Sequence, residues 1–444
     1  MRPFRIRGLS GIRAVKGKLT LPGDKSIAHR AIILGALCRG RTVVRNFPAN
    51  KDCLATLEVF RRLGIKSVRD SKRNCVSIYG KGLFGLKKPE SPIFIEESGT
   101  TYRLLLGVLS GQDFPSKLCA GRSLSRRPML RVIAPLRRMS ARLAGCACRG
   151  AKDEYPPVSV KVASLKPITY RIPVASAQVK SALLMAGLYV NGVTRLIEPV
   201  KTRDHTEKML EFFKAGIKVK GRNISLKGAK PLVSPGEVFI PGDISSAAFF
   251  IVLASILPGS RAMFEKVSLN PSRMGMIKAL KRMGADIKIS PVKCRYSTEP
   301  MGNITVKSRV LKGAVVKKEE IPSLIDELPV LMVAAAFARG KTVFTGVEEL
   351  RVKETDRINS MLVGLKAMGA VSRLVKKGRR EDIVIIGKGC LTGARLKSFS
   401  DHRTAMSAAV AGLAASGLTE IDDMNCVNKS FPGFTAALRS LVTG

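Results

Sequence analysis

The chain has 444 residues, of which 77 are lysine or arginine and 33 are aspartate or glutamate, so its formal net charge is +44. This length suggests two or three domains with sizeable cores. The charge favours anionic partners: phosphorylated metabolites, nucleic acid or a membrane surface. Aromatic residues make up only 5% of the chain and tryptophan is absent, which argues against a stacking platform for single-stranded nucleic acid.

Cysteine and histidine usage argues against a metal site. The nine cysteines are scattered without a pair of CxxC motifs, and the histidines are only His29, His205 and His402. We therefore expect no metal ligands, and reduced thiols in a cytoplasmic protein. The amino-terminal stretch lacks the apolar core of a signal peptide, and the longest apolar runs, such as 330–338, are too short to span a bilayer.

The first informative stretch, 21–34, predicts a Pro-Gly turn followed by a helix that Asp24 caps. Ser26 and Arg30 are four residues apart and share one helix face, and Lys25 lies in the first turn. Free backbone N–H groups, the helix dipole and these side chains would converge there, which predicts an anion site. The alternative is a basic surface helix with an ordinary cap.

An amphipathic helix that ends near a small residue, followed by a short strand, recurs along the chain. The small residues are Gly64, Ser140, Gly216, Gly284 and Gly369. A glycine just past such a helix is a typical carboxyl-terminal cap. The Pro-Gly-Asp sequence at 22–24 also recurs at 241–243, about half the chain later. We therefore predict two homologous halves of three α/β units each, rather than one Rossmann sheet.

Five further segments carry polar residues that are not typical of a core, namely 97–103, 125–129, 175–181, 351–357 and 400–403. The first opens a helix with small hydroxyl residues, as a phosphate or carboxylate cradle would. The second places two guanidinium groups before a helix that starts with proline. Taken singly, each segment is more often a solvated cap or loop.

Together these segments resemble the enolpyruvyl transferase family, and within it the branch of 3-phosphoshikimate 1-carboxyvinyltransferases (5-enolpyruvylshikimate-3-phosphate synthases). Eight markers follow the family's order over nearly the whole chain: 22–30, 98–101, 127–129, 176–178, 202–206, 324–327, 351–357 and 401–403. The resemblance implies an α/β fold of two similar domains, each of three βαβαββ units in an inside-out α/β barrel, which agrees with the six-fold pseudo-repeat.

The resemblance also implies how the chain is divided. A discontinuous first domain would comprise 1–22 plus 242–444 and hold both termini, and a second domain would comprise 23–241. The active site would lie in the cleft between them.

The implied reaction joins shikimate 3-phosphate to phosphoenolpyruvate and releases phosphate, in the shikimate pathway of aromatic amino acid biosynthesis. The 5-hydroxyl adds to C2 while C3 gains a proton, and elimination of phosphate from a tetrahedral intermediate restores the double bond. No cofactor is implied. We expect a cytoplasmic monomer whose partners are these two anionic substrates, with no specific nucleic acid and no membrane. Arginine forks suit the phosphate and carboxylate groups.

The resemblance further assigns site residues. Those for shikimate 3-phosphate are Lys25, Ser26, Arg30, Ser176, Ala177, Gln178, Arg203, Asp326 and Lys353. Those for phosphoenolpyruvate are Lys25, Gly99, Arg127, Gln178, Arg357, Arg403 and Lys429. Asp326 is expected to act as the base on the 5-hydroxyl, and Glu354, with Lys25, as the proton shuttle at C3. The simpler interpretations are a helix cap for Asp326 and an exposed ion pair for Glu354.

One departure from the family pattern lies next to the expected phosphoenolpyruvate site. Glu96 and Glu97 stand where the family usually has Gly-Asn. A carboxylate there should repel an anionic substrate unless a neighbouring arginine pairs with it.

Three alternatives stay open. The sister transferase that acts on UDP-N-acetylglucosamine usually carries a reactive cysteine shortly before its Arg-Pro pair, whereas Cys119 here is out of register. A nucleic-acid-binding protein is suggested by the charge alone, and its affinity would fall steeply with salt. An inactive relative is suggested by Glu96 and Glu97.

Overall fold

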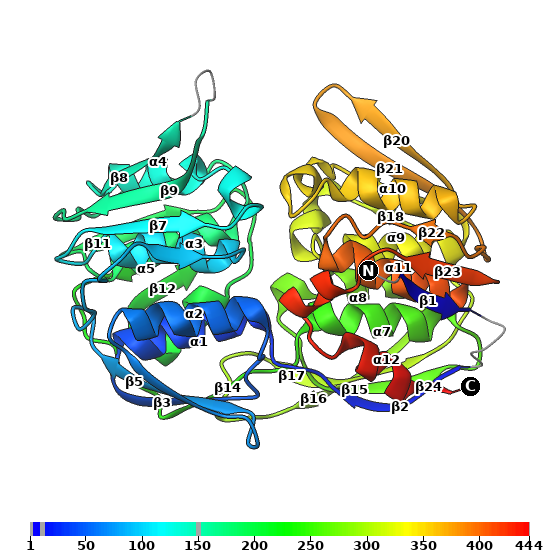
Figure 1. Cartoon of the computed structure of the whole chain (residues 1–444), viewed down its shortest axis with the longest axis horizontal. Coiled ribbons are helices and arrows are strands. Elements are labelled where there is room, and N and C mark those ends of the chain that lie inside the picture. The colour runs from blue at the N-terminus through cyan, green and yellow to red at the C-terminus, as the bar shows by residue number, and fades with distance from the viewer. Residues whose placement is uncertain (1–2, 9–13, 148–151, 444) are drawn as a thin grey trace. The chain divides into compact units, whose positions relative to one another are not determined.

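The computed structural model describes residues 3–8, 14–147 and 152–443, which fall into two compact units (Figure 1). Unit 1 comprises Met1–Pro22, Pro241–Lys293 and Pro300–Gly444, and unit 2 comprises Gly23–Ile240 and Cys294–Glu299. The short segment Cys294–Glu299 groups with unit 2 because the Phe239 amide donates to the Tyr296 carbonyl at 2.8 Å and His205 contacts Glu299 at 2.7 Å.

The described part of unit 2 contains three sheets of four strands, each formed by a βαβαββ module. In each sheet the first strand is parallel to the second, and the closing hairpin pairs antiparallel with the second. The first module is β14 (Glu237–Phe239), α1 (Lys25–Leu37), β3 (Arg39–Arg45), α2 (Lys51–Arg62), β4 (Lys66–Asp70) and β5 (Cys75–Lys81). The second is β6 (Ile93–Ile95), α3 (Gly99–Leu109), β7 (Ser116–Ala120), α4 (Leu130–Arg138), β8 (Arg142–Ala147) and β9 (Glu154–Lys161). The third is β10 (Thr169–Arg171), α5 (Ala177–Gly187), β11 (Val193–Ile197), α6 (His205–Phe212), β12 (Gly216–Lys220) and β13 (Asn223–Lys227).

Unit 1 repeats this plan. Its first module is β2 (Ala14–Thr20), α7 (Ile244–Ile256), β15 (Arg261–Ser268), α8 (Gly275–Arg282), β16 (Asp286–Val292) and β17 (Met301–Lys307), with β24 (Val442–Thr443) added at the edge. The second is β18 (Val315–Val316), α9 (Leu328–Phe337), β19 (Arg339–Thr345), α10 (Arg357–Ala367), β20 (Val371–Lys377) and β21 (Arg380–Lys388). The third is β22 (Arg395–Leu396), α11 (His402–Ala414), β23 (Leu418–Ile421) and α12 (Phe434–Leu441), and β1 (Phe4–Arg7) takes the place of the hairpin.

The predicted fold class, two similar halves of three βαβαββ units, is confirmed by this topology. Short 3-10 helices join some elements: η1 (Leu124–Arg126), η2 (Pro271–Arg273), η3 (Lys318–Ser323), η4 (Glu348–Val352) and η5 (Asn425–Lys429). No helix in the described ranges is both long enough and apolar enough to cross a bilayer.

Each unit has its own core around inner helices, α1, α3 and α5 in unit 2 and α7, α9 and α11 in unit 1. The sequences of α7 and α9 are apolar on almost every face, which is typical of a helix buried on all sides. Most inner helices begin at a polar cap whose side chain accepts a backbone N–H, as Asp24, Ser98, Ser176, Asp243 and Asp401 do. Polar groups therefore gather at the first turns of otherwise apolar helices.

The predicted helix ends are confirmed at most of the repeat positions. Gly64, Ser140, Gly284 and Gly369 follow their helices with positive φ, between 67° and 93°. The prediction for Gly216 is wrong, because α6 ends two residues earlier than the repeat suggested and Lys214, with φ of 60°, takes the left-handed position. Gly216 instead opens β12, where a Cβ atom would lie 3.0 Å from the Lys227 carbonyl oxygen.

Substitutions at Gly64 and Gly284 distinguish the cost of a left-handed backbone from the cost of a steric clash. A Cβ at Gly64 would lie 2.8 Å from Lys87 Cγ, whereas a Cβ at Gly284 would meet nothing within 4 Å. We expect Gly284→Ala to cost about 1–2 kcal/mol through its left-handed backbone alone, and Gly64→Ala to cost more. Calorimetric melting temperatures of both variants check this, and an unchanged temperature for Gly284→Ala would contradict it.

Candidate functional site

The start of α1 gathers the first group of predicted residues. Asp24 accepts the Ile27 amide at 3.0 Å and so closes the first turn. The ammonium of Lys25 binds the Asp52 carboxylate, on α2, at 3.1 Å and both side chains are partly buried. Lys25 is thus held by a carboxylate from the neighbouring helix that sequence reasoning missed, since no local pattern marks a residue 27 positions away.

Arg30 is almost fully buried and is fixed by three hydrogen bonds. Its Nε donates to Thr206 Oγ1 at 2.9 Å, its Nη2 to Ser181 Oγ at 3.0 Å, and its Nη1 to the Ser26 carbonyl at 2.9 Å. Burial lowers the pKa of Arg30 to about 10, partly offset by Asp24, so the group stays charged at neutral pH. Three of its five N–H groups bind the protein, which orients the guanidinium for an external anion.

The start of α5 joins this group. Ser176 caps the helix by accepting the Val179 amide at 3.4 Å, and Ala177 is its first residue. One turn later, Ser181 contacts Thr206, in the first turn of α6, at 2.6 Å. Arg203 lies just before that helix. Unit 2 therefore brings Lys25, Ser26, Arg30, Ser176, Ala177 and Arg203 to the first turns of three packed helices.

The start of α3 holds a second group within unit 2. A Cβ built on Gly99 would lie 2.7 Å from Arg127 Nη1 and 3.2 Å from Arg103 Nη1, so two guanidinium groups face the helix amino terminus. Gln178 joins them, because it accepts from Arg103 Nη1 at 2.7 Å and donates to Thr100 Oγ1 at 3.1 Å. A helix amino terminus that two guanidinium groups face has the features of an anion-binding site. Sequence reasoning missed Arg103, although it lies one helical turn beyond Gly99.

The unusual pair Glu96 and Glu97 is placed next to this group. Glu96 is exposed, whereas Glu97 is half-buried and accepts the Ser123 amide at 3.0 Å. Among the described residues Glu97 forms no ion pair. No arginine among them therefore offsets the repulsion that its carboxylate would exert on an anionic substrate. The Glu97 contact instead braces the loop that leads to Arg127.

In unit 1 the predicted residues meet around Arg357, whose side chain is 1% exposed. Its Nε donates to Asp401 at 2.8 Å, its Nη2 donates to Glu354 at 2.6 Å, and its Nη1 lies 3.7 Å from Asp326. Burial alone would lower the pKa of Arg357, but Asp401, Glu354 and Asp326 outweigh it and raise the pKa above its ordinary value. Asp401 also caps α11, a structural role that sequence reasoning did not assign.

Asp326 lies between two guanidinium groups. Arg403 donates from Nη1 to the Asp326 carbonyl at 2.9 Å, and its Nη2 is 3.8 Å from the carboxylate. The cap of α9 is Glu327, whose side chain makes no capping bond, so the helix-cap interpretation of Asp326 is wrong. The ion pair of Glu354 with Arg357 is confirmed, but it is not exposed, since the Glu354 side chain is 20% exposed and the arginine is buried.

Two more predicted residues of unit 1 border this cluster. Lys353 is half-buried, and burial lowers its pKa despite the nearby carboxylates of Asp326 and Glu349. Lys429 ends η5, which packs against α11. Within the described residues Lys429 forms no ion pair, so its place next to the cluster rests on that packing alone.

Three ligand-type residues of unit 2 also lie close together. Donor atoms of Asp204, His205 and Glu299 are all within 4.8 Å of one another. The Lys208 ammonium already pairs with both carboxylates, since its Nζ lies 3.3 Å from Glu299 and 3.8 Å from Asp204. The cluster therefore ties the segment that carries Glu299 to α6 and is a poor candidate for a metal centre.

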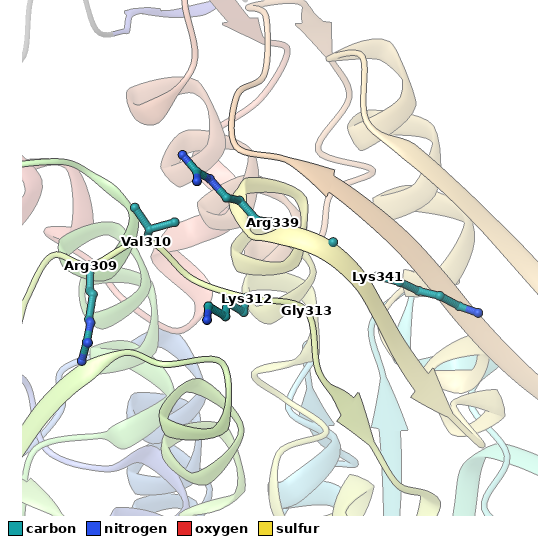
Figure 2. Close-up of a pocket in the computed structure, with 7 residues that line it drawn as sticks. Arg309, Val310, Lys312, Gly313, Arg339 and Lys341 are labelled. Carbon is teal, nitrogen blue, oxygen red and sulfur yellow. The ribbon is translucent and has the colours of Figure 1, made fainter.

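A broad hollow of about 850 Å³ in unit 1 lies apart from these groups (Figure 2). Its lining residues are Arg309, Val310, Lys312, Gly313, Arg339, Gly340 and Lys341. None of them is a predicted site residue. The side chains of Arg309, Arg339 and Lys341 point in different directions, so the hollow does not chelate one compact anion.

Comparisons with known proteins agree on one family. The family model of EPSP synthase (3-phosphoshikimate 1-carboxyvinyltransferase) matches residues 9–438. The 3-phosphoshikimate 1-carboxyvinyltransferase of Desulforamulus reducens is 43% identical over 98% of this chain and 99% of its own, and that of Desulforudis audaxviator is 46% identical over 97% of each.

Solved structures give the same result. The EPSP synthase of Acinetobacter baumannii superposes with a TM-score of 0.87 at 43% identity and covers 100% of this chain and 98% of that one. The enolpyruvyl transferase NikO from Streptomyces tendae, at 17% identity and a TM-score of 0.78, shares the fold.

His29, within the motif of Lys25 and Arg30, gives a pH test of this arrangement. It is fully buried against Thr56, and burial lowers its pKa from 6.5 to about 3, with Asp52 opposing and Lys25 and Arg30 adding to the shift. The unfolded chain therefore binds this proton first as pH falls. We expect the stability due to neutral His29 to be complete above pH 6.5 and to be lost by about 1.4 kcal/mol per pH unit between 6.5 and about 3.

Urea unfolding at a series of pH values measures this loss. His29→Gln should show a shallower acid dependence than the parent chain, because its side chain does not titrate. Parallel pH profiles for the two proteins would contradict the burial of a neutral imidazole.

Proposed function

Since this chain belongs to the EPSP synthase (3-phosphoshikimate 1-carboxyvinyltransferase) family, we propose that the residue groups of both units serve one reaction. That reaction transfers the enolpyruvyl group of phosphoenolpyruvate to the 5-hydroxyl of shikimate 3-phosphate and releases phosphate, in the shikimate pathway. The observation that carries the assignment of residues is the buried cluster around Arg357. It holds the two expected acid–base groups, Asp326 and Glu354, on one guanidinium.

Shikimate 3-phosphate is bound mainly by unit 2 in this proposal. The binding residues are Lys25, Ser26, Arg30, Ser176, Ala177, Gln178 and Arg203, with Asp326 and Lys353 from unit 1. Support comes from the fixed, charged Arg30 and from the amino termini of α1 and α5, whose N–H groups and dipoles favour a phosphate.

Phosphoenolpyruvate is bound by groups of both units. The binding residues are Lys25, Gly99, Arg127 and Gln178 of unit 2 and Arg357, Arg403 and Lys429 of unit 1. The absence of a side chain at Gly99 supports this, because the backbone approaches Arg127 closely enough for an anion to bind both. Arg357 and Arg403 supply planar forks that match carboxylate and phosphate groups.

In this proposal the two carboxylates of the cluster carry the acid–base steps. Asp326, beside two guanidinium groups, accepts the proton of the 5-hydroxyl as its oxygen attacks C2. Glu354, with Lys25, delivers a proton to C3, which gives the tetrahedral intermediate. Glu354 then takes a proton from the resulting methyl group while phosphate leaves, and arginine forks stabilise the departing charge.

We also propose a monomer that works in the cytoplasm and has no specific nucleic-acid or membrane partner. The eight described cysteines are all free thiols, which suits a reducing compartment. Every step above is proton transfer and charge stabilisation by side chains, so the reaction calls for no metal or cofactor.

Phosphate release tests the reaction and its base. We expect purified protein to release phosphate only when shikimate 3-phosphate and phosphoenolpyruvate are both present. Asp326→Asn should lower kcat by about 10²–10⁴, the usual contribution of a general base. Asp286→Asn, an aspartate in β16 of the same unit, is the matched control and should leave kcat unchanged.

The other outcomes of this assay are informative. Release with UDP-N-acetylglucosamine as acceptor would move the chain to the sister branch. Substrate binding without release would identify an inactive relative, and Glu97→Asn would then be the first reversal to test.

Gly99→Ala tests the phosphoenolpyruvate site. The new methyl group would lie 2.7 Å from Arg127 Nη1, so the guanidinium must shift by roughly 1 Å, and displacements of that size cost up to about 10²-fold. We expect KM for phosphoenolpyruvate to rise about tenfold or more while KM for shikimate 3-phosphate changes little. Gly35→Ala in α1, whose methyl would make an ordinary 3.4 Å contact, is the control. Equal effects of the two variants would contradict the assignment.

A further inference from the structure

Lys180 is a buried charge for which the reaction above has no use. It lies on α5, its side chain is 0% exposed, and its ammonium contacts two carboxylates, Glu207 at 2.7 Å and Glu198 at 3.0 Å. Both carboxylates are themselves less than 5% exposed. Three charged groups are therefore withdrawn from water at one point of unit 2.

The two carboxylates lie on either side of Arg203 in the sequence. Glu198 accepts the Thr202 amide at 3.1 Å and also the Thr202 hydroxyl, so it closes the turn that ends next to Arg203. Glu207 lies in the first turn of α6, four residues beyond Arg203. The Lys180 ammonium thus contacts one carboxylate before Arg203 in the sequence and one after it.

Lys180 itself belongs to the start of α5. The Lys180 amide donates to the Ser176 carbonyl at 3.1 Å, so Lys180 belongs to the turn that presents Ser176 and Ala177. The next residue, Ser181, contacts Thr206 at 2.6 Å and accepts from Arg30 at 3.0 Å. The network therefore joins the segments that carry the proposed shikimate 3-phosphate ligands.

Stability alone is a poor reason for such a network. Replacing a buried ion pair by apolar groups of similar size is often neutral or stabilising, and in some proteins such pairs are retained because they specify one geometry. Burial raises the pKa of Glu207, an effect that Lys180 partly offsets. The site thus keeps three charged groups in a place where uncharged side chains would pack.

We propose that Lys180, with Glu198 and Glu207, is a positioning residue for the shikimate 3-phosphate site, where it fixes Arg203 relative to Ser176 and Ala177. This inference rests on the proposed function. Gln178, in the same turn of α5, is also held by Arg103 and Thr100 of α3, so we expect the phosphoenolpyruvate site to be affected less than the shikimate 3-phosphate site.

Steady-state kinetics of three variants test the proposal. Lys180→Met keeps the length of the side chain and removes the ammonium that contacts Glu198 and Glu207. We expect KM for shikimate 3-phosphate to rise by about tenfold to 10²-fold. Thr202→Val removes only the hydroxyl bond to Glu198 and should give a smaller rise. KM for phosphoenolpyruvate and kcat should change less than twofold in both. A merely structural role would not separate the two KM values in this way.

Val76→Ala, in the core of unit 2 within β5, is the control for general destabilisation and should leave both KM values unchanged. If Lys180→Met does not fold, the neutral variant Lys180→Met/Glu198→Gln/Glu207→Gln and Thr202→Val carry the test. Folded variants with the parental KM for shikimate 3-phosphate, or with equal rises for both substrates, would overturn the proposal. An inactive parent chain would instead overturn the proposed function.

Discussion

The inner helices impose the constraint on which both units depend. A helix buried on all sides leaves its first N–H groups without water, and at most of these helices a side chain satisfies them. Asp24, Ser98, Ser176 and Asp401 do this, and each stands at the beginning of a helix that carries proposed ligands. The caps that make an apolar helix tolerable also create the polar, positively polarised turns where anions bind.

A cap of this kind is not sufficient to make a site, as the homologous turn of unit 1 demonstrates. Asp243 caps α7 as Asp24 caps α1, and Ser245 corresponds to Ser26. The position of Lys25 is taken by an isoleucine, and the local arginine, Arg273, is 2% exposed and is bonded to Ser245. Glu327 lies 3.6 Å from the same guanidinium, so the charge is neutralised within the protein. The two halves thus share a fold and a capping scheme, but only one turn keeps cations for a ligand.

Much of this architecture can be predicted from the sequence because its signals are local. Helix-ending glycines, Pro-Gly-Asp turns and polar first turns each lie within a few residues of chain, and they revealed six units in two halves. The failure at Gly216 had a local cause as well, since a lysine can adopt the left-handed conformation that the repeat assigned to glycine.

What the sequence could not supply are the partners that packing brings together. Asp52 reaches Lys25 across 27 residues, and Arg103 reaches Gln178 across 75. In the sequence nothing distinguishes Lys180 from the other lysines, and only the structure shows that it is buried. The proton-transfer roles of Asp326 and Glu354 came from resemblance, and only their shared contact with Arg357 gives those roles a physical setting.

The charge of the chain is distributed unevenly between the two residue groups. In unit 1 the cations Arg357, Arg403 and Lys353 lie among the carboxylates of Asp326, Glu354, Asp401 and Glu349. In unit 2 the cations Lys25, Arg30, Arg103, Arg127 and Arg203 greatly outnumber Asp24 and Asp52. Carboxylates close to the cations of unit 1 limit the local excess of positive charge, which suits acid–base chemistry. The excess of cations suits capture of two multiply charged anions. The net charge of +44 is far larger than the excess in these two groups, so most of it lies away from the proposed site residues.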